Sequence, residues 1–197
     1  LFELLFAETY GISLVKPSVR ETAAWLSIWD ADVAKEVAKR APLLLLTAGD
    51  PASLSLSVRS TALERIVSSM KEADDSPLLD HDALRRFSSP DMAPQIRGLW
   101  KKHAASPPIR LLLLKMIWLG RMSACKDIAS EAAFSTYSDG YTLILAGRGV
   151  SATADTQELR RYAAKVIADA VTMDATHLWD ALDQLFMRGL GVEDFLT

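Results

Sequence analysis

Apolar residues recur every three to four positions along most of the chain, and this spacing predicts a protein built almost entirely from amphipathic helices. The clearest case is residues 56–73, where Val58, Ala62, Ile66 and Met70 would share one face of a helix. Pro, Asp and Ser stand just before many of the apolar runs, where they favour helix starts. Strand signals are nearly absent. The expected fold class is therefore all-α.

Residues that start or end helices divide this pattern into individual predicted helices. Ser18 and Glu21 have the spacing of a capping box, which predicts the start of the first helix. Asp30 is the predicted N-cap of the helix that follows. Leu43–Leu46 is too short and isolated for a strand, so we expect a helical turn or a buried connector there. The further predicted helices are 31–41, 56–73, 80–87, 90–104, 107–121, 124–134, 137–152, 156–171 and 174–188, with another starting at 192–196.

The connections between these helices are short, which predicts antiparallel neighbours. A polar break at 74–77 is the main irregularity, and we expect residues 1–197 to form a single helical-repeat domain with a less regular region near 74–80. The sequence opens without an initiator Met or the basic segment of a signal peptide, which suggests a domain cut from a longer protein. The helix at 137–152 is the weakest prediction, since each of its glycines costs about 1 kcal/mol relative to Ala.

An internal repeat accompanies the helical pattern. Residues 109–134 can be laid over residues 141–166 at an offset of about 32 residues, and the apolar positions match while most polar positions differ. Residues 58–63 look like the same element once more, one longer spacing upstream. A period of this length is typical of stacked helix pairs.

These elements resemble the HEAT-repeat family, in which an Asp/Pro turn is followed by a β-branched residue, an Arg, and small and large apolar residues. The matching positions are Asp50, Pro51, Val58, Arg59, Ala62 and Leu63, then Pro107, Pro108, Ile109, Arg110, Leu113 and Leu114, then Asp139, Tyr141, Thr142, Leu145 and Ala146. The third copy lacks the Arg. The resemblance implies antiparallel helix hairpins stacked as an α-solenoid fragment of about five pairs.

The Trp- and Leu-rich beginning of the chain is also similar to the C-terminal sensor halves of large bacterial signal-transducing NTPases of the NACHT class. That resemblance implies a nucleotide-binding part elsewhere in the parent protein, since no GxxxxGK[ST] phosphate loop occurs in this sequence.

Charge is unevenly distributed along the chain. Residues 76–130 hold 9 Lys and Arg against 4 Asp and Glu, whereas the segments on either side are acidic and the net charge of the chain is −3. A basic middle between acidic ends suggests a surface that contacts an acidic partner. The candidate contact residues are Arg85, Arg86, Arg97, Trp100, Lys101, Lys102 and Arg110.

No residue set indicates catalysis, a cofactor or a metal. His81, His103 and His177 are far apart, and Cys125 is better explained as a small buried apolar residue than as a reactive thiol. Gly147–Ser151 lacks the context of a phosphate loop, and core packing explains most of the tryptophans, with Trp100 as the surface exception. The single cysteine favours a cytoplasmic location, and no apolar run is long enough to cross a membrane.

The sequence therefore predicts a protein-interaction or scaffolding module that is not an enzyme. The partner would be another protein or another domain of the parent chain. The alternative is binding to the phosphate backbone of a nucleic acid through the basic middle, although the overall acidity disfavours it.

Overall fold

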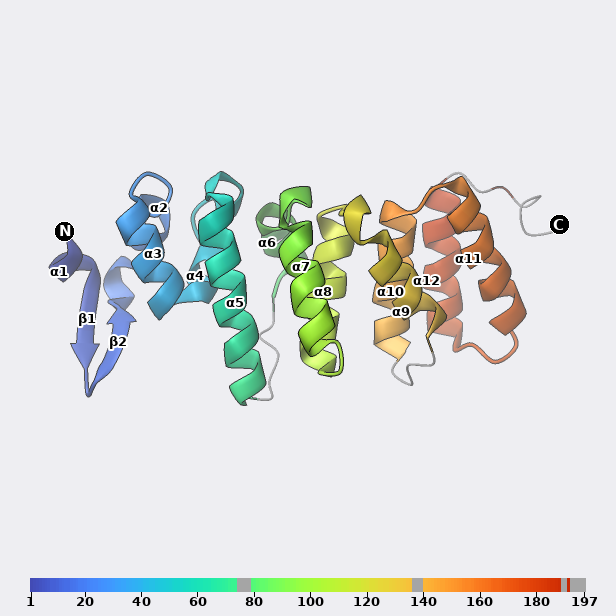
Figure 1. The fold of residues 1–197 in the computed structure, drawn as a ribbon, viewed down its shortest axis with the longest axis horizontal. Coiled ribbons are helices and arrows are strands. Elements are labelled where there is room, and N and C mark those ends of the chain that lie inside the picture. The colour runs from blue at the N-terminus through green and yellow to red at the C-terminus, as the bar shows by residue number, and fades with distance from the viewer. Residues whose placement is uncertain (74–78, 136–139, 189–190, 192–197) are drawn as a thin grey trace. The chain divides into compact units, whose positions relative to one another are not determined.

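The computed structural model describes residues 1–73, 79–135, 140–188 and 191, in two compact units, Leu1–Met92 and Ala93–Thr197. Helices dominate both units, so the predicted all-α class is confirmed (Figure 1). The boundary between the units follows Met92. Most of the predicted break near 74–80, and the expected final helix at 192–196, lie outside the described residues.

The first unit contains a short β-hairpin and a set of helices. Its elements are α1 (Phe2–Leu5), β1 (Phe6–Thr9), β2 (Ile12–Val15), η1 (Pro17–Val19), α2 (Arg20–Leu26), α3 (Ala31–Arg40), α4 (Pro42–Thr47), η2 (Pro51–Ser53), α5 (Leu56–Ala73), α6 (His81–Phe87) and η3 (Pro90–Met92). Helix α3 packs against α2, α4 and α5. Its Val33, Ala34, Val37 and Ala38 are fully buried, as expected for one face of an amphipathic helix.

Helix starts in this unit follow the sequence in part. The Asp30 carboxylate accepts hydrogen bonds from the backbone N–H groups of Asp32 and Val33, both at 3.0 Å, which confirms the predicted N-cap of α3. The Leu43–Leu46 run is helical and lies within α4. The predicted capping box at Ser18 and Glu21 is not formed, because η1 leads directly into α2 and no side chain caps that helix.

The β-hairpin was missed by the sequence analysis. Phe6 pairs with Val15 and Thr9 with Ile12, and the turn places both Tyr10 and Gly11 at positive φ, 53° and 75°. Two successive residues at positive φ form the turn type that joins tight hairpins, for which the usual sequence signal is Asn-Gly or Asp-Gly. Tyr-Gly does not carry that signal, so no strand or hairpin was predicted for this segment.

The second unit consists of three successive helix pairs. Its elements are α7 (Ala93–His103), α8 (Pro107–Leu119), η4 (Ser123–Cys125), α9 (Lys126–Phe134), α10 (Gly140–Thr153), α11 (Thr156–Asp169) and α12 (Ala175–Met187). The helices α7, α9 and α11 each pack against the helix that follows them, and α10 packs against both α8 and α12. The second helices of the pairs therefore lie side by side (Figure 1).

Helix α10 forms despite its glycines, and close packing explains why. A Cβ added at Gly147 would lie 2.2 Å from the hydroxyl oxygen of Tyr162, and one at Gly149 would lie 3.0 Å from the Cβ of Ala129. The first distance is shorter than real Cβ contacts and the second is tighter than most of them, so these glycines permit α9 and α11 to approach the α10 backbone. Tertiary contact thus compensates for the weak helix propensity of Gly.

Candidate functional site

The predicted basic surface is divided between the two units. Arg85 and Arg86 are exposed on α6 of the first unit, and Arg85 forms an exposed ion pair with Asp82 at 3.0 Å. The other candidates belong to α7 and α8 of the second unit. The Arg85–Asp82 ion pair is so exposed that it contributes little to stability.

Two of the predicted contact residues lie in the core. Trp100 and Arg110 expose only 7% and 5% of their surface, so neither offers a face to a partner. The Arg110 guanidinium donates to the Ala104 carbonyl at 3.0 Å and to the Thr142 hydroxyl at 3.2 Å. A buried cation needs such partners, so its position in an apolar run reflects a structural role.

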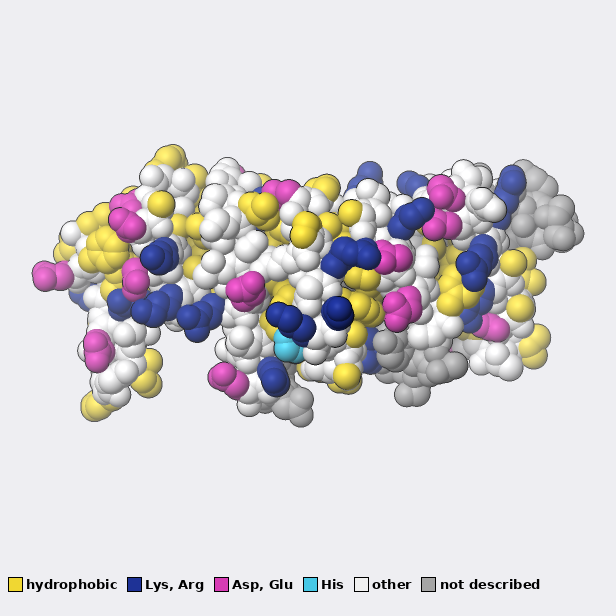
Figure 2. All heavy atoms as spheres, viewed as in Figure 1, with side chains coloured by type: hydrophobic (Ala, Val, Ile, Leu, Met, Phe, Trp, Pro, Cys, Tyr) yellow, Lys and Arg dark blue, Asp and Glu magenta, His cyan; other side chains and the backbone are white. Residues whose placement is uncertain are grey.

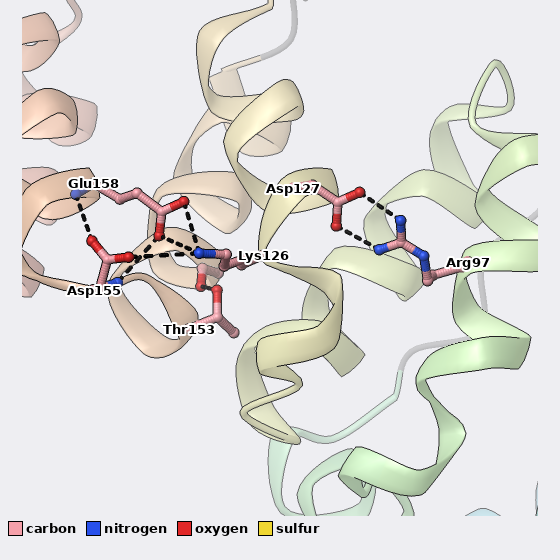
Figure 3. A network of polar contacts seen from close by, with 7 residues as sticks. Arg97, Lys126, Asp127, Thr153, Asp155 and Glu158 are labelled. Atoms are coloured by element: carbon pink, nitrogen blue, oxygen red, sulfur yellow. Dashed lines mark hydrogen bonds and ion pairs between the residues drawn. The ribbon is translucent and has the colours of Figure 1, made fainter.

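Arg97 is exposed, but it is engaged inside the unit. It donates to Asp127 at 2.6 Å and to the Ala124 carbonyl at 2.8 Å, which ties α7 to the start of α9 (Figure 3). The Arg97 hydrogen bond and positive charge lower the pKa of the Asp127 carboxyl below its ordinary value. This forked geometry is the one that Arg and a carboxylate prefer.

Of the predicted contact residues in the second unit, Lys101 and Lys102 are the cations that remain available. Both are exposed in the last turn of α7, and among the described residues neither has an ion-pair partner. In the view of Figure 2, basic and acidic side chains alternate over the second unit and form no continuous basic area.

A second polar contact joins α9 to α11. The Lys126 ammonium lies 3.2 Å from Glu158 and 3.6 Å from Asp155 (Figure 3). Asp155 and Glu158 also form the capping box of α11, because the Asp155 carboxylate accepts from the Glu158 N–H at 3.0 Å and the Glu158 side chain accepts from the Asp155 N–H at 3.2 Å. Together with Arg97 and Asp127, this contact extends a polar connection over α7, α9 and α11.

A parallel set of contacts joins the second helices of the pairs. Arg148 of α10 holds Asp180 of α12 through two nitrogens at 2.5 and 3.0 Å, and its guanidinium lies 4.6 Å from the ring centre of Trp118 of α8. Ser151 donates to the Gln184 carbonyl at 2.9 Å. The segment Gly147–Ser151 is thus part of a packed helix and has no phosphate-loop geometry.

These contacts share a spacing. Arg110 and Thr142, Lys126 and Glu158, and Arg148 and Asp180 are each separated by 32 residues, and Ser151 and Gln184 by 33. In the first unit, buried Arg59 reaches Asp91, also 32 residues away, at 3.1 Å. The spacing equals the offset at which the sequence aligns with itself, and Arg110 and Thr142 are aligned positions of that repeat.

The exposure of the tryptophans is the opposite of what the sequence predicted. Trp100, predicted to be the surface exception, is buried, whereas Trp25, Trp29 and Trp179 expose 48%, 73% and 73% of their surface. Trp25 and Trp29 stack on each other, with ring centres 6.4 Å apart and planes at 19°. No sequence pattern indicates this pair, because the small residues Ala23, Ala24 and Ser27 are buried at this position while the larger indoles stay outside.

The first unit also has an open groove, whose lining on α2 includes Glu21, four residues before Trp25. Its volume is about 510 Å³, and it lies between the start of α2 and the end of α4. It is lined by Pro17, Ser18, Arg20, Glu21, Thr22, Leu44, Thr47 and Ala48.

The cysteine and histidines show no metal site. Cys125 is fully buried, its thiol donates to the Ala93 carbonyl at 3.7 Å, and burial raises its pKa, which confirms the structural role expected for it. Within the described residues, no group of three or more His, Cys, Asp or Glu side chains could hold a metal ion. In the same part of the chain, no helix is both long and apolar enough to span a bilayer.

Comparison with known proteins gives no match. No family model matches the sequence, no curated protein is similar to it, and no solved structure matches its fold.

Proposed function

We propose that the chain is a protein-interaction scaffold built from HEAT-like helix pairs, and that it is not an enzyme. The observation that carries this proposal is the recurrence of side-chain contacts between successive helix pairs at a spacing of 32 to 33 residues. Stacked repeats whose members contact only their neighbours leave long faces open, and proteins of this architecture commonly use such faces for binding.

The HEAT-like reading is supported by the two residues that the sequence alignment equates. Arg59 and Arg110 are both buried, and each donates to a backbone carbonyl as well as to a side chain of a later element. Equivalent structural roles at equivalent positions are what a repeat requires. A sensor segment of a NACHT-class NTPase is one setting in which such a scaffold would work.

The contact surface on the second unit is centred on Lys101 and Lys102. Arg97 and Arg110 are engaged by Asp127 and Thr142, so, of the predicted contact residues in this unit, the two lysines are the cations left for an acidic partner. Exposed charges at the edge of an interface mainly steer association and set partner choice.

Charge reversal tests this surface. Affinity capture with the unmodified chain identifies bound proteins, and a Lys101→Glu/Lys102→Glu double variant should lose the partner at moderate salt. A Lys35→Glu/Lys39→Glu variant on α3 is the matched control, because it reverses two exposed lysines outside the proposed surface. Equal loss of a partner in both variants, or retention in both, would contradict the assignment.

Nucleic-acid binding is the second candidate, and the surface supports it less well. Phosphate-driven binding needs several unpaired cations along a continuous face, whereas basic and acidic side chains alternate over the second unit in the view of Figure 2. A titration with labelled duplex DNA and RNA separates the two functions. Tight binding at low salt that weakens steeply as salt rises would favour the nucleic acid.

A further inference from the structure

Trp25 and Trp29 form a pair of stacked indoles on the surface of the first unit. On helix α2, Ala23 and Ala24 are buried in the core, whereas the larger side chain of Trp25 stays on the surface. Large aromatic groups that stay exposed while alanines fill the core suggest a contact surface.

Within the described residues, these indoles carry no basic side chain, unlike several other rings of the chain. The ring of Phe6 lies under Arg40 at 4.8 Å, and the ring of Phe134 under Arg161 at 5.0 Å. Trp118 is covered by Arg148 in the same way. In the described part of the chain, no basic side chain covers Trp25 or Trp29, although indole is the ring that attracts cations most strongly.

Acidic side chains flank the pair. Residues 20–32 contain Glu21, Asp30 and Asp32 against a single basic residue, Arg20. Glu21 and Trp25 are four residues apart and share one face of α2, and Asp30 directly follows Trp29. The Asp30 carboxylate accepts hydrogen bonds from two N–H groups of α3, which hold it at the start of that helix.

The groove of the first unit has lining residues on the same helix as Trp25. Glu21 and Thr22 belong to its lining and lie about one turn before Trp25. A bound chain that places a cation on the indoles can therefore run along the groove toward Pro17 and Thr47.

We propose that the Trp25–Trp29 pair and the adjoining groove bind a basic, extended segment of a partner protein, with an Arg or Lys side chain stacked on an indole and paired with the flanking carboxylates. This surface is separate from the Lys101–Lys102 surface and selects the opposite charge. The inference therefore goes beyond the proposed function and holds or fails independently of it.

Nuclear magnetic resonance of the ¹⁵N-labelled full chain tests the proposal. The chain has five tryptophans, whose indole N–H signals can be assigned to Trp25 and Trp29 by Trp25→Phe and Trp29→Phe variants. The probe is a decapeptide of alternating Arg and Pro, and the control peptide replaces each Arg by Glu. We expect the basic peptide to shift the Trp25 and Trp29 signals saturably, and the acidic peptide to leave them in place.

Two variants give the matched comparison. Glu21→Gln/Asp32→Asn should weaken binding roughly three- to tenfold, as expected for loss of exposed charge partners of a stacked cation. Asp183→Asn should leave binding unchanged, because it neutralises an exposed carboxylate near the lone Trp179. The proposal is overturned if Trp179 shifts as much as the pair, if both peptides act alike, or if the Glu21/Asp32 variant binds with unchanged affinity.

Discussion

Arg148 shows how single polar residues stabilise this fold. Its guanidinium is about three-quarters buried and contacts two helices, through the carboxylate of Asp180 on α12 and the ring of Trp118 on α8. Removing one member of a partly buried pair leaves the other charge without compensation, which costs more than the pair itself contributes. The same reasoning applies to Arg59, whose partner Asp91 lies on a later element of the chain.

An Arg148→Ala variant should lower the free energy of unfolding by about 2 kcal/mol, because it removes a forked ion pair and a cation–π contact at once. Chemical denaturation followed by circular dichroism measures the change. Arg85→Ala is the control, since Arg85 pairs with Asp82 within one helix turn on the surface, and such pairs contribute only about 0.5 kcal/mol. Equal losses in the two variants would contradict a special role for Arg148.

Asp127 should report its pairing with Arg97 through its titration. The hydrogen bond and charge of Arg97 lower the pKa of Asp127, so the pair stabilises the folded state above the ordinary pKa of Asp, and this contribution is lost as the pH falls through the lowered pKa. The carboxyl ¹³C signal of Asp127 should titrate below the normal range. In an Arg97→Ala variant, we expect the pKa of Asp127 to rise toward its ordinary value; an unchanged pKa would show that the pair does not form.

At the level of whole elements, α10 is the helix that the sequence predicts least well and the structure explains best. Its glycines weaken the isolated helix, yet Gly147 and Gly149 allow Tyr162 and Ala129 to approach its backbone. Propensity and packing therefore act in opposite directions. Packing prevails because α10 contacts all four of the helices α8, α9, α11 and α12.

The two effects can be separated by adding one methyl group. Gly147→Ala should destabilise the protein by about 1 to 3 kcal/mol, because the new Cβ would meet the Tyr162 hydroxyl. Gly98→Ala on α7 should instead stabilise it by about 0.5 to 1 kcal/mol, because no atom lies within 4 Å of the added Cβ and helix propensity alone changes. Thermal unfolding of both variants checks the opposite signs.

The sequence predicted elements well where local chemistry decides them, as with the Asp30 cap and the helical Leu43–Leu46 run. It failed where a tertiary partner decides. The hairpin depends on positive φ at Tyr10, which the residue type does not signal. Burial of Arg110 depends on Thr142, and the exposure of Trp25 depends on neighbouring alanines that fill the core. These outcomes cannot be read from periodicity, because periodicity assigns a residue to a face without identifying what covers it.

At the scale of the whole molecule, two compact units carry surfaces of different character. The first has exposed tryptophans beside carboxylates, and the second has two exposed lysines at the end of α7. A scaffold with two such surfaces would bind an acidic region and a basic region of its partners at separate places. We propose that these surfaces serve binding, and that the repeating contacts between helix pairs stabilise the fold that carries them.

Site-specific photo-crosslinking tests that claim most directly. A photoreactive amino acid placed at position 101 or 102 should form a crosslink to a partner in extracts of the source cell, and excess unlabelled chain should compete it away. The same group at position 35 or 39 should give no such product. A crosslink of equal yield at all four positions, or none at 101 and 102 while the partner is captured, would contradict the account.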